Sequence, residues 1–363
     1  MPRRLRVLMT SDAAGGLAAH TRTLAAALTA RGHQVWLAVF GPGAQSDWPA
    51  GVELFAADYR LEWMDGQDGE DLPGEIAASR RWLQELARTW RPDLLHCNQF
   101  GYVGCLAGVP SLLAVHSDVV SWWRNVRGGL PPDSAFHRWY RRLALEALAA
   151  ARAVAVPSRT AAADLNASFS FAHPVEVIPN GCAAAALPPY PKQLQAVTLA
   201  RAWDPAKQIA LLGACHAARR AGWELAVAGE TVHPATGACV PAPEGVRLLG
   251  RLPASQAAEM LRRAAVYIAT SCYEPFGLAP LEAALSGCAL LLNDIPSFRE
   301  IWGDAAAYFS RNDGAALDAA LVQLALAPAE VARLAARAHR RAGKLGADAM
   351  AVAYAAAYAR CLA

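Results

Sequence analysis

The chain has 363 residues, 55% of them apolar, and carries 34 Lys and Arg against 31 Asp and Glu, for a formal charge of +3. This balance differs from the strongly basic charge of a nucleic-acid binder, so a nucleic-acid partner is disfavoured. The length suffices for two domains of ordinary size, each with its own core.

The composition also bears on compartment and on metals. The apolar run near the N-terminus, residues 7–10, is too short for a signal peptide, and alanine supplies much of the apolar content. We therefore expect a cytoplasmic protein without a transmembrane helix. The eight cysteines show no CxxC pair and no zinc-type spacing, which predicts reduced, mostly buried thiols and no metal site.

Short apolar runs alternate with amphipathic segments up to about residue 180. The pattern predicts strands at 6–9, 35–40, 93–96, 111–115, 153–156 and 175–178. It predicts helices at 16–31, 76–89, 135–151 and 159–166. Strands that alternate with helices are typical of βαβ units in a parallel sheet covered on both faces.

The periodicity stops at residues 178–193, IPNGCAAAALPPYPKQ, whose prolines are typical of a linker. It then resumes, with strands predicted at 196–200, 224–229, 246–250, 266–270, 289–293 and 306–309. Helices are predicted at 206–221, 255–264 and 278–287. After residue 314 only helical spacing remains, with breaks near Pro328 and Gly346.

The predicted fold class is therefore α/β, with two doubly wound Rossmann-like domains. We assign residues 1–185 to the first domain and 186–346 to the second, and expect the C-terminal helix, 347–363, to pack back on the first. Open parallel sheets bind ligands beyond the carboxyl ends of their strands, so we expect the active site in a cleft between the domains.

The segment SCYEPFGLAPLEAALSGCALLLND, residues 271–294, places two acids around a helix start. Glu274 follows the strand at 266–270, and Glu282 lies in the early turns of the next helix. The first amides of that helix have no internal partner and suit a phosphate or sugar oxygen, which Gly277 allows to come close. The alternative is that both acids are simply solvated.

Residues 274–287, EPFGLAPLEAALSG, resemble the E-x7-E signature of the retaining glycosyltransferases of family four, which have the GT-B architecture. The resemblance implies that Glu282 holds the ribose of the donor nucleotide and that Glu274 contacts hydroxyls of the donor sugar. It also implies that three amides meet oxygens of the sugar or diphosphate, those of Phe276, Gly277 and Leu278.

A second match is LARAWDPAKQIALL, where Arg201 follows a strand and Lys207 comes six residues later. The family has an Arg and a Lys at this place, which implies that both neutralise the departing nucleotide diphosphate. Ala200 and Gln208 stand where the family has glycines, so the path of the loop differs from the family pattern. Taken alone, the pair would be read as solvated surface cations.

Three residues of the first half extend the resemblance, and His96 is a further candidate because of its place at a strand end. Gly15 and Gly16 follow the first strand, which implies a glycine loop facing the donor diphosphate and the acceptor. His116 ends the strand at 111–115, which implies a position near the donor sugar. We expect His96, at the end of the strand at 93–96, to face the same cleft, and packing in the domain is the alternative for both histidines. No GxGxxG follows a strand, so a nicotinamide dehydrogenase is disfavoured.

Two further features concern the acceptor and the membrane. Trp122 and Trp123, expected in a loop after His116, are candidates for a wall that binds the acceptor, with plain packing as the alternative. A helix with three arginines beside an apolar face could rest on anionic lipid or be an ordinary domain helix, and these arginines are Arg138, Arg141 and Arg142. Peripheral contact with the inner membrane face therefore stays open.

These features predict a retaining glycosyltransferase that moves a hexose from a nucleotide diphosphate sugar to a hydroxyl of an acceptor of unknown class. A UDP-sugar is preferred as the donor, and a GDP-sugar is left open. No metal or other cofactor is expected. The alternative is a noncatalytic partner subunit of the same fold that binds a nucleotide sugar.

Overall fold

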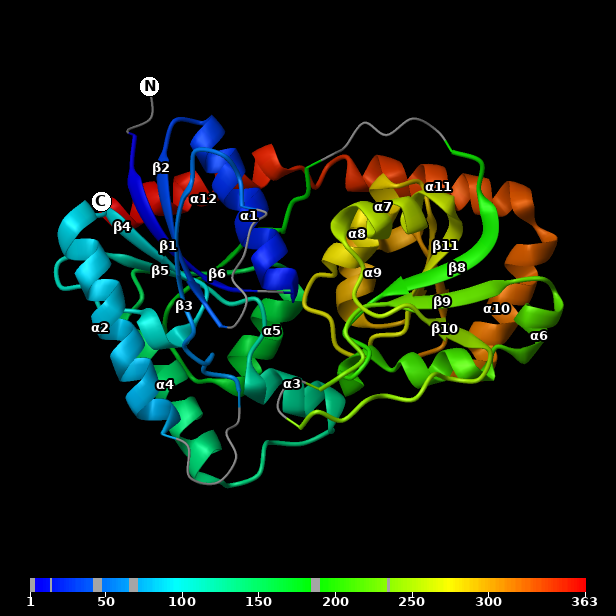
Figure 1. Ribbon diagram of the computed structural model, residues 1–363, viewed down its shortest axis with the longest axis horizontal. Helices are drawn as coiled ribbons and strands as arrows, with labels where there is room; N and C mark the ends of the chain where they lie inside the picture. Colours follow the sequence, from blue (N-terminus) through cyan, green and yellow to red (C-terminus); the bar gives the residue numbers. More distant parts are fainter. Residues whose placement is uncertain (1–3, 14, 42–47, 65–70, 184–189, 234–235) are drawn as a thin grey trace. The chain divides into compact units, whose positions relative to one another are not determined.

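The computed structural model describes residues 4–13, 15–41, 48–64, 71–183, 190–233 and 236–363 (Figure 1). The chain divides into two compact units. The first unit comprises residues 1–183 together with 347–363, and the second comprises residues 184–346. The boundary predicted near residue 185 lies outside the described residues.

The first unit contains a seven-stranded sheet of order β3-β2-β1-β4-β5-β6-β7, and all its pairs are parallel. Its strands are β1 Arg6–Asp12, β2 Gln34–Phe40, β3 Glu53–Ala57, β4 Leu94–Cys97, β5 Ser111–Ala114, β6 Ala153–Val156 and β7 Val175–Val177. The order reverses between β1 and β4, and ligands of doubly wound sheets bind at such a switch point.

Helices cover both faces of this sheet. They are α1 Gly15–Ala30, α2 Leu72–Trp90, α3 Val119–Val126, α4 Ala135–Ala150, α5 Arg159–Ser168 and α12 Ala347–Leu362, with the 3₁₀ turn η1 Phe100–Tyr102. α2, α4 and α5 contribute to one core, and α1 and α12 contribute to the other. The last helix of the chain thus packs beside the first (Figure 1).

The second unit contains a six-stranded parallel sheet of order β10-β9-β8-β11-β12-β13. Its strands are β8 Gln193–Leu199, β9 Glu224–Ala228, β10 Val246–Leu248, β11 Ala264–Ala269, β12 Ala289–Asn293 and β13 Ala307–Phe309. Its α-helices are α6 His216–Arg220, α7 Ala254–Arg263, α8 Leu278–Leu285, α9 Pro296–Trp302, α10 Gly314–Leu326 and α11 Pro328–Ala342. Its 3₁₀ turns are η2 Pro205–Lys207, η3 Ile209–Ala214 and η4 Gly303–Ala305. Here the strand order reverses between β8 and β11.

The α/β class is confirmed. The elements β3 and α9 were not predicted, and two local predictions are corrected. The segment with Trp122 and Trp123 is the helix α3 rather than a loop, because Asp118 caps it by accepting the Ser121 amide at 2.7 Å. The helix predicted at 206–221 is broken into η2, η3 and α6, since Gln208 takes a left-handed conformation with φ 45°.

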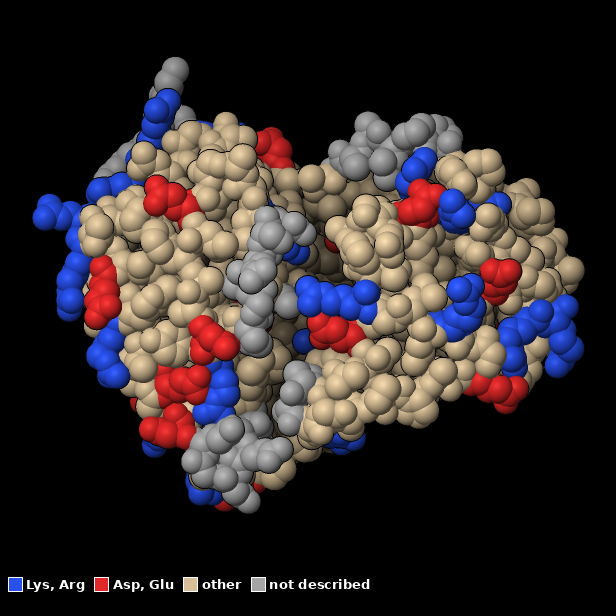
Figure 2. Space-filling view, viewed as in Figure 1, with Lys and Arg blue, Asp and Glu red and all other residues tan. Residues whose placement is uncertain are grey.

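Surface charge and cysteine state agree with the composition. Lys and Arg lie among Asp and Glu on the visible face of both units (Figure 2). All eight cysteines are free thiols and five of them are buried. Among the described residues no single helix is long and apolar enough to cross a membrane, although α10 and α11, bent by 106°, pass together by length and composition alone.

Candidate active site

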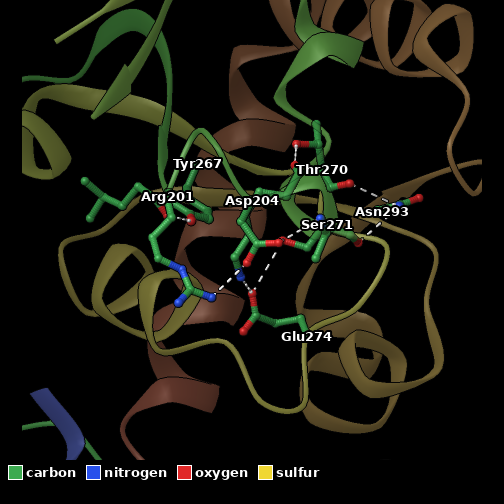
Figure 3. Close-up of polar contacts among 10 residues, drawn as sticks. Arg201, Asp204, Tyr267, Thr270, Ser271, Glu274 and Asn293 are labelled. Atoms are coloured by element: carbon green, nitrogen blue, oxygen red, sulfur yellow. Dashed lines mark hydrogen bonds and ion pairs between the residues drawn. The ribbon is translucent and has the colours of Figure 1, made fainter. Parts of the chain in front are cut away.

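The carboxyl ends of β8 and β11 carry the predicted cations and one of the predicted acids (Figure 3). Arg201 comes two residues after β8, and Lys207 ends the turn η2. Glu274 lies in the loop between β11 and α8. Because β8 and β11 are neighbours in the sheet, these loops lie side by side although the residues are far apart in sequence.

Lys207 and Glu274 form an ion pair. Lys207 Nζ lies 2.5 Å from Glu274 Oε2, and the two side chains are only 16% and 20% exposed. The Ser271 hydroxyl donates to the same carboxylate oxygen at 3.4 Å. The site therefore places a mostly buried cation and a mostly buried carboxylate in direct contact.

Arg201 is held by a second carboxylate. Its Nη2 lies 2.8 Å from Asp204 Oδ2, and its guanidinium carbon lies 5.1 Å from the centre of the Trp203 ring. Asp204 is nearly buried at 5% exposure and also caps η2 by accepting the Ala206 amide at 3.0 Å. Arg201 remains 44% exposed, so part of its planar donor group is open to an anion.

Hydrogen bonds to backbone carbonyls join these two loops. The Thr270 hydroxyl donates to the Lys207 carbonyl at 2.6 Å, and the Cys272 amide donates to the Ala206 carbonyl at 2.9 Å. Asn293, fully buried at the end of β12, donates to the Thr270 and Ser271 carbonyls at 3.3 and 3.1 Å. These contacts fix the two loops that carry the ion pair (Figure 3).

Sequence reasoning missed four supporting residues, namely Asp204, Thr270, Ser271 and Asn293. A signal existed for Asp204, because an Asp before Pro205 is a common cap of a helical turn. Asn293 could have been noted as a polar end to a fully apolar strand. The neighbouring Asp294 instead pairs with Arg299 at 2.7 Å, and this pairing lowers the pKa of Asp294.

The start of α8 has the backbone that the sequence predicts. Gly277 has φ 90°, and a Cβ there would lie 3.1 Å from the Phe298 ring, so this position requires glycine. Phe276 is buried, whereas Leu278, the first residue of α8, is partly exposed. The helix begins without a side-chain cap. Its first amides are therefore not used by a capping side chain and could bind an oxygen.

Tyr267 lies near Glu274 and also near the second predicted acid, Glu282 on α8. Burial raises the pKa of the Tyr267 phenol, and the charges of Glu274 and Glu282 raise it further. The phenol donates to the Leu199 carbonyl at the end of β8 at 3.3 Å. Both carboxylates thus lie close enough to the same buried hydroxyl to act on it electrostatically.

The first unit places its predicted residues around the switch between β1 and β4. Gly15 and Gly16 begin α1 after β1, and a Cβ on either would meet nothing within 4 Å. Gly15 has φ 80°, a conformation that favours glycine. His116 follows β5, and its Nε2 lies 3.0 Å from Asn98 Oδ1. Burial lowers the pKa of His116 to about 4, so the ring is neutral near pH 7.

His96 lies deeper than expected. It is fully buried, its Nδ1 lies 2.6 Å from the Tyr358 hydroxyl, and burial lowers its pKa to about 3. Tyr358 of α12 thus engages Nδ1, whereas Nε2 has no partner among the described residues, and the contact with an acceptor stays a prediction. Sequence reasoning missed His20, whose ring centre lies 4.3 Å from that of His116. The sequence did contain a signal for His20, because it is a histidine on the helix that follows the glycine pair.

Trp122 and Trp123 lie on α3 and are partly exposed, with their ring centres 5.9 Å apart. The Arg127 guanidinium lies 5.7 and 6.0 Å from the two rings. On α4, Arg138 pairs with Asp133, and Arg141 donates to the Ser168 carbonyl. The acceptor wall and the membrane contact stay predictions.

Two family models match the chain. Residues 14–185 match the model described as Glycosyltransferase Family 4, and residues 194–326 match the model described as Glycosyl transferases group 1. The chain belongs to glycosyltransferase family 4. Together the matches cover the strands of both sheets except β1 and the first residue of β8, and they include the segments with Arg201 and Glu274.

Solved structures share the fold of this glycosyltransferase. Sucrose-phosphate synthase from Thermosynechococcus elongatus is 18% identical, with 98% of this chain and 99% of that chain covered and a TM-score of 0.77. HepE of Anabaena, in complex with UDP-glucose, is 14% identical, with 98% and 100% covered and a TM-score of 0.73. WaaG, a glycosyltransferase involved in lipopolysaccharide biosynthesis, is 15% identical, with 97% and 98% covered and a TM-score of 0.72. No curated protein matches the sequence significantly.

The described part of the glycosyltransferase contains no group of three or more His, Cys, Asp or Glu residues that could hold a metal ion. The charged groups at β8 and β11 are two cations, each paired with one acid. Such an arrangement can bind a diphosphate through the cations and sugar hydroxyls through a carboxylate.

Proposed function

We propose that this protein is a retaining glycosyltransferase that moves a hexose from a UDP-sugar to a hydroxyl of an acceptor. The observation that carries the proposal is the contact of Lys207 with Glu274 at 2.5 Å, beside Arg201, at the carboxyl ends of β8 and β11. Membership of family 4 supports it. The preference for UDP rests on the UDP-glucose complex of HepE, a structure with the same fold.

Arg201 and Lys207 neutralise the diphosphate as it departs. Glu274 accepts hydrogen bonds from hydroxyls of the donor sugar, and Glu282 does the same for the ribose. The amides at the start of α8 donate to sugar or diphosphate oxygens. Because the Lys207 side chain is only 16% exposed, its charge is poorly screened and stabilises the leaving group strongly.

In the transfer step, the bond between the sugar's anomeric carbon and the diphosphate oxygen breaks, and a bond to the acceptor oxygen forms on the same face. The acceptor's proton passes to the departing phosphate oxygen. Glu274 as a covalent nucleophile is disfavoured, because its carboxylate is engaged by Lys207 and by the Ser271 hydroxyl. When the donor binds, Lys207 exchanges part of this contact for a phosphate oxygen.

The test is to measure release of UDP from UDP-glucose by the protein and by Arg201→Ala and Lys207→Ala. We expect each variant to lower kcat roughly 10²–10³-fold, the usual effect of removing one charge-stabilising donor. Arg333→Ala is the matched control, because Arg333 lies on α11 of the same unit and pairs with Glu330 on the surface. Its kcat should stay within about twofold of the parent. Unchanged turnover in both site variants would refute the proposed roles.

The same assay separates the enzyme from a noncatalytic partner subunit. A glycosyltransferase should release nucleotide slowly from its donor even without an acceptor, whereas a subunit that only binds the sugar nucleotide should release none. Repeating the assay with a GDP-hexose tests the base, and we expect UDP-glucose to be the better substrate. The metal-free mechanism predicts equal rates with and without EDTA.

A further inference from the structure

The first unit contains a mostly buried polar cluster around His116. It consists of His20 on α1, His96 at the end of β4, the adjoining Asn98, and His116 after β5. His20 is 1% exposed, and neither of its ring nitrogens has a hydrogen-bond partner among the described residues. A neutral imidazole donates a hydrogen bond from one nitrogen and accepts one at the other. The position of the hydrogen on His116 therefore determines which groups each of its nitrogens can bind.

The side-chain amide of Asn98 has a defined orientation. Its Nδ2 lies 2.7 Å from the Thr10 carbonyl, which can only accept a hydrogen bond. The second hydrogen of this NH₂ group faces the Thr21 hydroxyl at 3.5 Å, whose own hydrogen is donated to the Leu17 carbonyl. The NH₂ group is therefore engaged on one side, and Oδ1 is left as the atom that faces His116.

This orientation determines the tautomer of His116. Asn98 Oδ1 is an acceptor, so His116 Nε2, 3.0 Å away, must carry a hydrogen. Burial lowers the pKa of His116 to about 4, so the neutral ring carries only that one hydrogen at pH 7. Nδ1 is then a lone-pair acceptor.

The groups around His116 favour its neutral form. His20 and His96 have pKa values lowered by burial, and in both the nearby His116 contributes to the lowering. Among the described residues, two further titratable side chains contact these histidines, those of Tyr354 and Tyr358 of α12, and burial raises the pKa of both. A proton on any imidazole would therefore lack an anionic partner within this set.

We propose that Asn98 is a positioning residue that holds His116 as the Nε2–H tautomer, so that Nδ1 accepts a hydrogen bond from a substrate hydroxyl. An acceptor nitrogen binds a sugar hydroxyl but cannot donate to a phosphate oxygen. His116 therefore recognises the sugar part of a substrate and not its diphosphate. The identity of the substrate rests on the proposed function, whereas the tautomer does not.

The tautomer is measured directly by NMR on the full chain with ¹⁵N-labelled histidine, with His116 assigned from the spectrum of His116→Asn. We expect a protonated Nε2 and an unprotonated Nδ1 at pH 7. A hydrogen on Nδ1 would overturn the proposal. This readout needs no activity, so it separates failure of the inference from failure of the proposed function.

Ligand titration tests the second half of the proposal. UDP-glucose should shift the Nδ1 resonance in the direction of an accepted hydrogen bond without protonating it, and UDP alone should leave it unchanged. An equal shift with UDP would show that His116 reads the nucleotide or phosphate, and would overturn the selection of a hydroxyl. No shift with either ligand would overturn it as well.

The variant Asn98→Asp tests the link between the two residues. A carboxylate beside Nε2–H should raise the pKa of His116 by at least about one unit, and turnover near pH 6 should fall relative to pH 8. Gln84→Glu is the matched control, because Gln84 likewise donates its amide to a backbone carbonyl, that of Cys105 at 2.8 Å. It should leave the His116 titration unchanged. An unaltered His116 titration in folded Asn98→Asp would refute the coupling, and if that variant does not fold, the parent spectrum still decides the tautomer.

Discussion

Glu62 is a carboxyl group buried in the first unit, 4% exposed. It accepts hydrogen bonds from the backbone amides of Phe100, at 2.7 Å, and Gly101, at 2.5 Å, at the start of η1. These bonds favour the ionised form, but burial outweighs them and raises the pKa of Glu62 to about 7. A single side chain thus joins the loop before α2 to the end of β4.

The raised pKa predicts a pH dependence of stability. Because the pKa is about 7 in the folded state against 4.5 for the free group, the stabilisation is complete below pH 4.5 and is lost as the pH rises through 7. We expect the free energy of unfolding of the first unit to fall by up to about 3 kcal/mol from this group between pH 5 and pH 8.

Urea unfolding at a series of pH values measures this effect, and Glu62→Gln should flatten the slope between pH 5 and pH 8. Glu75→Gln serves as the control, since Glu75 pairs with Arg60 at 2.6 Å in the same unit and remains 24% exposed. It should keep the slope of the parent. A Glu62→Gln protein that keeps the parental slope would contradict the assignment.

At the scale of elements, the end of β9 sets the position of the loop that carries Arg201. Gly229 follows β9 with φ 141°, and a Cβ there would lie 1.8 Å from the Ala200 carbonyl oxygen. The Ala200 amide donates to the Ala228 carbonyl at 2.9 Å. Ala200 therefore cannot move away from Gly229 without breaking this hydrogen bond. The close approach of these two strand ends requires glycine.

Gly229→Ala should therefore destabilise the second unit by roughly 2 kcal/mol or more, because strained backbone and a steric overlap both contribute. It should also lower kcat, since the displaced segment leads directly into Arg201. Thermal unfolding and the UDP-release assay measure the two effects. Gly237→Ala is the control, because Gly237 also has a positive φ of 67° but a Cβ there would meet nothing within 4 Å. Equal stability of the two variants would count against the steric explanation.

At the scale of the whole molecule, the first unit is built from both ends of the sequence. α12 buries Met350, Tyr354 and Tyr358 in the core that it shares with α1. Tyr358 also bonds His96, at the end of β4. The second unit, in contrast, is one continuous stretch of chain.

Deletion of residues 347–363 should consequently unfold the first unit and spare the second. Hydrogen exchange followed by mass spectrometry measures this, and we expect lost protection in β1, β4 and β5 with unchanged protection in β8, β11 and β12. Val352→Ser is the control, because Val352 lies on the same helix but is 47% exposed. If the shortened chain keeps its protection in the first sheet, α12 is dispensable for that core.

Local patterns accounted for most elements of the fold. Strands such as β2 and β12 are nearly continuous apolar runs, and the predicted breaks near Pro328 and Gly346 separate the three C-terminal helices. β3 was missed because ELFAA is only half-buried and lies at the sheet edge, where the apolar signal is weak. η3 was read as part of a helix because apolar spacing does not reveal the left-handed Gln208.

For the site, sequence alone determined the family resemblance, the acids and cations, and the glycine that starts α8, because each is carried by a short motif with its own chemistry. Tertiary structure decided which of these groups touch. Parallel pairing of β8 with β11 brings Lys207 to Glu274, and pairing of β4 with β5 brings Asn98 near His116. Burial then decided that His96 lies in the core and that His116 is neutral, since burial depends on contacts between segments that no local pattern records.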